Sequence, residues 1–74
     1  MTQSEILEEL ADILGATPGS LTPETRLDAE GIRWDSMALL AYLAFLRFHF
    51  GKTRSGISCA AFTTVADLLA EIQA

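Results

Sequence analysis

The chain has 74 residues, half of them hydrophobic, and a formal net charge of −5. A chain of this length forms one small domain, expected to span residues 1–74, with a core that provides little surplus stability. So small a domain has no room for a deep enclosed active site, so an enzyme is not expected. The acidic charge argues against nucleic acid as a partner. The class that remains is a binding, carrier or interaction module.

The chain contains one cysteine and one histidine, so no internal disulfide can form and no metal site is expected. Cys59 is expected to be a small core residue, and His49 a surface residue near the end of a helix. The N-terminus is acidic, unlike a signal peptide, and the apolar stretch from Met37 to Leu46 is too short to span a bilayer. We expect a soluble, cytoplasmic protein without a membrane partner.

The first predicted helix begins after Thr2, because Thr2 and Glu5 have the spacing of a capping box. Apolar residues then repeat at helical spacing, and Gly15 is expected to end the helix. Residues 15–35 contain both prolines and three of the five glycines, which predicts a long loop of the kind that is usually functional. In this loop, Thr22-Pro23-Glu24 is expected to start a short helical turn. Three apolar side chains are expected to hold the loop on the core: Leu21, Leu27 and Ile32.

A second helix is predicted from Ser36 to about Phe50. Asp35 suits its N-cap, because the carboxylate accepts hydrogen bonds from N–H groups that a helix start leaves free. Trp34 is expected to pack over the first turn against Leu39. Ser36 then occupies the first helical position with its hydroxyl in water. An anion attached there would face free N–H groups and the positive end of the helix dipole.

This second helix is apolar nearly all round, so it is either fully buried or keeps one apolar face for a partner. At 100° per residue, one side is the expected core: Leu39, Leu40, Leu43, Leu46 and Phe50. The opposite side is the expected partner surface, together with Trp34 and Met37: Ala38, Ala41, Tyr42, Phe45 and Phe48.

The C-terminal third begins with a basic loop at residues 52–56, and no acid occurs between Ser36 and Ser58. A short third helix is predicted from Ile57 to Phe62. A second capping-box pattern at Thr64 starts the last helix, which runs to the C-terminus with an apolar stripe. The sequence shows no repeats and no strand alternation. It predicts an all-α fold, a small bundle of three main helices plus one short helix, with a long loop between helices one and two.

The order of these elements and the aspartate-serine start of the second helix resemble the acyl carrier protein family over nearly the whole chain. Four segments carry the resemblance: residues 21–27 (LTPETRL), 34–37 (WDSM), 50–51 (FG) and 63–69 (TTVADLL). The resemblance implies a discrete acyl or aminoacyl carrier with 4′-phosphopantetheine attached covalently to Ser36. Such a carrier holds thioester-linked intermediates for a fatty-acid, polyketide or specialised-metabolite pathway.

The resemblance also implies a role for the neighbours of Ser36 and a set of partners. Asp35 would cap the helix and aid modification, while Met37 stands where leucine is usual. The implied partners are a phosphopantetheinyl transferase, a loading enzyme and a downstream synthase or transferase, and we expect a monomer or weak dimer. Two features depart from the family: the second helix lacks an acidic docking face, and residues 31–34 (GIRW) replace the glycine pair of peptidyl carriers.

Two other interpretations compete with the carrier. The first is an unmodified helical interaction module, dimerising through the aromatic face of the second helix. The second is a catalytic triad of Asp35, Ser36 and His49. Ser36 and His49 lie thirteen residues apart on one helix, about 20 Å at 1.5 Å per residue. That separation is far beyond hydrogen-bond reach and excludes the triad.

Overall fold

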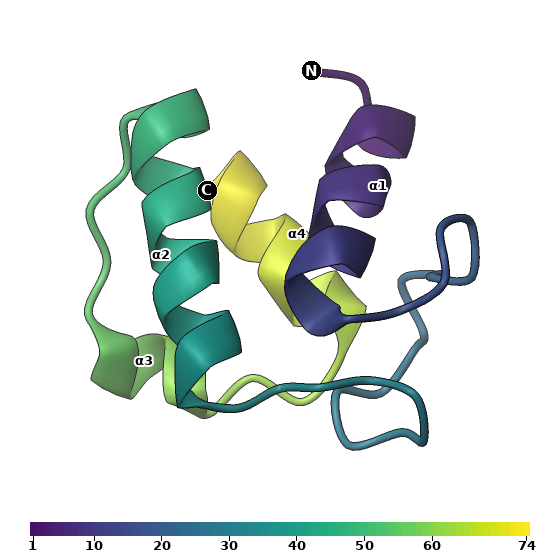
Figure 1. Cartoon of the computed structure of the whole chain (residues 1–74). Helices are drawn as coiled ribbons and strands as arrows, with labels where there is room; N and C mark the ends of the chain where they lie inside the picture. The colour runs from purple at the N-terminus through teal and green to yellow at the C-terminus, as the bar shows by residue number, and fades with distance from the viewer.

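The computed structural model describes all 74 residues and contains four α-helices, with no β-structure beyond one isolated bridge. The main helices are α1 (Gln3–Leu14), α2 (Ser36–Phe50) and α4 (Val65–Gln73), and α3 (Gly56–Ala60) is short. In Figure 1, α4 passes behind the space between α1 and α2, and α3 lies beside one end of α2. The predicted all-α bundle is confirmed. None of the four helices is both long enough and apolar enough to cross a bilayer.

Both predicted capping boxes are present, at the starts of α1 and α4. The Thr2 hydroxyl accepts from the Glu5 N–H at 3.2 Å, and the Glu5 carboxylate accepts from the Thr2 N–H at 2.9 Å. Thr64 and Asp67 make the same reciprocal pair at 3.4 and 3.1 Å. Hydrogen bonds from backbone N–H groups lower the pKa of both carboxyls. Gly15 ends α1 as predicted, with the left-handed φ of 66° that a glycine adopts without strain.

The loop between α1 and α2 is ordered by its apolar side chains. Leu21 and Leu27 are buried and Ile32 is half-buried against the core, as predicted. The predicted helical turn at Thr22-Pro23-Glu24 is not formed. The segment is a tight turn, closed by a hydrogen bond of 3.0 Å from the Thr25 N–H to the Thr22 carbonyl.

The segment does not become helical because the backbone groups of the loop form hydrogen bonds elsewhere. Three hydrogen bonds join the loop to the start of α4: Leu27 N–H to Thr63 O at 2.8 Å, Val65 N–H to Thr25 O at 2.9 Å, and Ala66 N–H to Pro23 O at 2.9 Å. The carbonyls that would continue a helical turn are therefore used by α4 instead, which satisfies two orphan N–H groups of its first turn.

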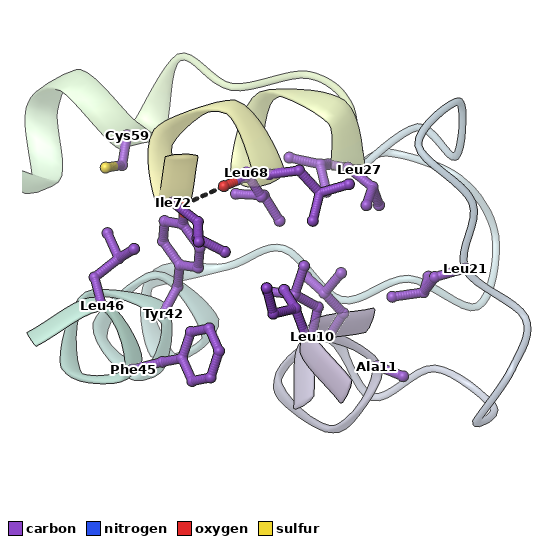
Figure 2. Close-up of a cluster of buried hydrophobic side chains, with 14 residues drawn as sticks. Leu10, Ala11, Leu21, Leu27, Tyr42, Phe45, Leu46, Cys59, Leu68 and Ile72 are labelled. Atoms are coloured by element: carbon purple, nitrogen blue, oxygen red, sulfur yellow. Dashed lines mark hydrogen bonds between the residues drawn. The ribbon is translucent and has the colours of Figure 1, made fainter. Parts of the chain in front are cut away.

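The core gathers side chains from all four helices and from the loop, as Figure 2 shows. Tyr42 of α2 is fully buried at its centre, and its hydroxyl donates to the Leu68 carbonyl of α4 at 2.7 Å. Its ring meets Phe62 edge-on, with centroids 6.5 Å apart. Cys59 of α3 is also fully buried, as predicted, and burial raises the pKa of its thiol.

The predicted orientation of α2 is wrong, by about one residue step of 100°. Ala38, Tyr42 and Phe45, predicted on the partner surface, are 2%, 0% and 6% exposed and belong to the core. Leu40, predicted in the core, is 62% exposed. Leu46 is buried as predicted. The other members of the predicted core stripe are half-buried at its margin: Leu39, Leu43 and Phe50.

Candidate functional site

Ser36 occupies the first position of α2, with an exposed side chain. Asp35 is the N-cap, as predicted. Its carboxylate accepts from the Ala38 N–H at 2.9 Å, and its carbonyl accepts from the Leu39 N–H at 2.9 Å. The N–H groups of Ser36 and Met37 have no acceptor in the protein. The first turn of α2 contains no acid. An anion on the Ser36 oxygen would therefore meet two free donors and the positive end of the helix dipole.

The segment before Ser36 is anchored at Arg33. Its N–H donates to the Leu14 carbonyl at the end of α1, at 2.8 Å. Its guanidinium lies 3.8 Å from the Asp35 carboxylate, but both side chains are about half or more exposed, so this ion pair contributes little stability. The backbone bond ties the start of α2 to the end of α1 and fixes where Ser36 emerges.

Trp34 packs toward the buried face of α2. It is half-buried, and its ring meets the Tyr42 ring edge-on, with centroids 6.1 Å apart and planes at 74°. Beside it is a shallow hollow of about 170 Å³, bordered by an Arg26–Asp28 ion pair with contacts of 2.9 and 3.1 Å. The sequence did not predict this hollow, because its walls come from three separate segments: Arg26, Leu27 and Asp28, then Trp34, then Phe62 and Thr63.

The other serines differ from Ser36 in ways that matter for an attached anion. Ser20 donates to a backbone carbonyl, and Ser55 and Ser58 bond to each other at the start of α3. Ser4 also lies exposed in a first helical turn, that of α1, but Glu5 is in the same turn. Ser36 also has a carboxylate neighbour, the N-cap Asp35, but Ser36 is the first residue of its helix whereas Ser4 is the second.

The exposed side of α2 differs in part from the predicted partner surface. Met37 and Phe48 are 70% and 84% exposed, and Ala41 is also exposed, as predicted. Leu40 and Ala44 join them, although the sequence interpretation did not place them there. The spacing of Met37, Ala41, Ala44 and Phe48 is that of one helical face. This spacing is visible in the sequence, but the opposite side of the helix is equally apolar, so the spacing alone does not show which side is exposed.

His49 lies exposed in the last turn of α2, with its ring 4.9 Å from the buried Phe45 ring. It is at the opposite end of the helix from Ser36, so the two cannot act together in catalysis. No three side chains of the types His, Cys, Asp and Glu come together to hold a metal ion.

No protein-family model, curated protein or solved structure matches the chain. The candidate site at Asp35 and Ser36 is therefore defined by its own geometry.

Proposed function

We propose that the protein is an acyl or aminoacyl carrier, with 4′-phosphopantetheine attached to the Ser36 hydroxyl. The observation that carries the proposal is the setting of Ser36: an exposed hydroxyl on an acid-free first turn, beside two unpaired backbone N–H groups. The long ordered loop before it and the order of the four helices also agree with a carrier.

The residues around Ser36 fit an attached phosphodiester. The free N–H groups of Ser36 and Met37 favour the negative charge of a phosphate attached to the Ser36 oxygen. Asp35 fixes the first turn through its bond to Ala38 and, as the only carboxylate adjacent to Ser36 in sequence, can help hold magnesium during attachment. The bound arm supplies a thiol for thioester formation. The chain itself supplies attachment, presentation and recognition, and no catalysis.

Such a carrier works through transient encounters. The proposed partners are a phosphopantetheinyl transferase, an enzyme that loads the acyl or aminoacyl group, and a synthase or transferase that removes it. Each must reach Ser36, and the exposure of that side chain at the end of α2 allows this without unfolding.

The test is the intact mass of the 74-residue protein after incubation with coenzyme A, magnesium and a broad-range phosphopantetheinyl transferase. The wild-type chain should gain one phosphopantetheine group. Ser36→Ala should gain none and keep its helical circular dichroism. The matched control is Ser4→Ala, which removes another exposed serine of a first helical turn and should be modified normally. Modification of Ser36→Ala, or none of the wild type, would overturn the proposal.

An unmodified helical interaction module is the second candidate, favoured by the exposed apolar side of α2. It predicts no mass gain in any variant, so the same experiment separates the two functions.

A further inference from the structure

One side of α2 carries apolar side chains that are mostly exposed to solvent. Met37, Leu40 and Phe48 are 70%, 62% and 84% exposed. We call this surface the α2 stripe, and its members are Met37, Leu40, Ala41, Ala44 and Phe48. From Met37 to Phe48 it extends about 16 Å at 1.5 Å per residue. Small monomers rarely leave such a contiguous apolar surface without a partner.

The charges around the stripe are few and lie at its ends. No acid occurs between Ser36 and Ala66. Arg47 borders the stripe near the C-terminal end of α2 and forms none of the ion pairs in the structure. At the other end is Asp35, whose side chain is 48% exposed. The helix dipole adds a positive N-terminus and a negative C-terminus.

We propose that two copies of the protein associate through the α2 stripe, with the two helices antiparallel about a two-fold axis. Four of its five members are symmetric about a midpoint between Ala41 and Ala44, and Leu40 is the exception because the symmetric position is the buried Phe45. An antiparallel copy therefore places Met37 opposite Phe48 at both ends and Ala41 opposite Ala44 in the middle. The small Ala41 and Ala44 side chains allow the two backbones to approach closely, and the longer Met37 and Phe48 side chains pack together at each end of the interface. This self-complementarity identifies a second copy as the occupant.

The electrostatics select the same arrangement. Antiparallel helices place opposite ends of their dipoles together. In this register, Arg47 of one copy lies at the level of Ala38 in the other, about 4.5 Å along the axis from Asp35. The two Arg47 guanidinium groups are therefore nine residues apart along the axis, about 13.5 Å, and each lies toward the end of the partner helix that carries Asp35. A parallel pair would instead place like ends of the two dipoles together and both Arg47 side chains at the same level along the axis.

The dimer must be weak, because the stripe is short. A pair of such faces buries on the order of 1,000 Å² in total, the lower end of specific interfaces. Association should therefore depend on concentration, and a dilute monomer should leave Ser36 accessible. The proposal does not depend on what Ser36 carries.

Sedimentation equilibrium of the full 74-residue chain, from low micromolar to millimolar concentration, tests the association. The apparent mass should rise from 8.0 kDa toward twice that value. Ala44→Glu should remain monomeric at every concentration. Ala70→Glu, which places the same charge on an exposed alanine of α4, should dimerise like the wild type. A wild type that stays monomeric, or an Ala44→Glu that dimerises as well as Ala70→Glu, would overturn the proposal.

Cysteine cross-linking tests the antiparallel register. A mixture of Met37→Cys and Phe48→Cys chains under mild oxidation should give a mixed disulfide dimer, and each variant alone should give far less. Cys59 is fully buried and should not compete. If each variant cross-links efficiently with itself and the mixture gains nothing, the helices are parallel and the proposed arrangement is wrong.

Discussion

The two sides of α2 have similar apolar composition and opposite surroundings. One side places Ala38, Tyr42 and Phe45 in the core, and the other exposes Met37, Leu40 and Phe48. What separates them lies outside the helix. Tyr42 finds an acceptor at Leu68 and an aromatic neighbour in Trp34, and no such partners exist for the other side. The comparison shows that the neighbours of an apolar helix, rather than its own sequence, decide which side is buried.

Introducing a glutamate on the buried side of α2 and, separately, on its exposed side should give the largest difference in stability. Phe45→Glu puts an unpaired carboxylate into the core and also loses the packing of a buried phenylalanine, which alone costs about 3–5 kcal/mol. We expect this variant to be unfolded at room temperature. Phe48→Glu, three residues away, should melt near the wild-type temperature. Circular dichroism melts of the two variants measure the difference, and similar melting temperatures would show that α2 is oriented otherwise.

Removing the helix cap should have the next largest effect. Asp35→Ala deletes the acceptor of the Ala38 N–H and should cost about 0.5–2 kcal/mol in free energy of unfolding. Asp35→Asn keeps a capping oxygen and should stay within a few tenths of a kcal/mol of wild type. Urea denaturation of both variants provides the test. An alanine variant as stable as the wild type would contradict the cap assignment.

The buried hydroxyl of Tyr42 should contribute less. Tyr42→Phe removes the 2.7 Å bond to the Leu68 carbonyl and should cost about 0.5–1.5 kcal/mol near neutral pH. Burial raises the pKa of Tyr42 above its ordinary value, so in the folded state the phenol resists losing its proton. The wild type should therefore lose stability as the pH rises above about 10, where the unfolded chain ionises.

Tyr42→Phe lacks this alkaline loss, so the stabilities of the two proteins should converge as the pH rises. Both proteins contain Cys59, whose raised thiol pKa adds the same alkaline loss to each. The measurement is the free energy of unfolding of both proteins between neutral pH and pH about 11. A constant difference across that range would contradict the assignment.

The smallest effect is expected at Leu40, on the exposed side. Leu40→Ala removes a side chain that is 62% exposed and should change stability by no more than about 0.5 kcal/mol. Leu46→Ala, the same substitution at a fully buried position, should cost about 2–5 kcal/mol. Equal losses in urea denaturation would show that Leu40 is in the core, as its sequence pattern predicts.

The sequence predicted those parts of the fold that short-range chemistry determines. The caps at Thr2, Asp35 and Thr64 and the end of α1 at Gly15 follow from the residues beside them. The setting of Ser36 was predictable for the same reason. The predicted short helix, Ile57 to Phe62, begins one residue after the observed start of α3 and ends two residues beyond its observed end.

The remaining features depend on contacts between distant segments. The orientation of α2 depends on its contacts with Leu68 and Phe62, and the sequence of the helix itself carries no information about where those two residues lie. The turn at Thr22-Pro23-Glu24 is not helical because the Pro23 carbonyl accepts from Ala66 instead. The hollow at Trp34 needs three segments of chain to form its walls. Local sequence patterns carry no information about contacts between distant segments, so these features could not be predicted from a single sequence.

The three backbone bonds between the first loop and the start of α4 also set an order of events during synthesis. The loop that leads to Ser36 is held by Thr63, Val65 and Ala66, which a ribosome adds long after Ser36 itself. A nascent chain that ends before Thr63 lacks all three partners, and only the bond from the Arg33 N–H to the Leu14 carbonyl ties the end of the loop to α1. The cap beside Ser36 can form as soon as Ala38 is present, but the loop that leads to it is fully anchored only after Ala66 has emerged. The modifying enzyme proposed above would meet the anchored loop only after that point in synthesis.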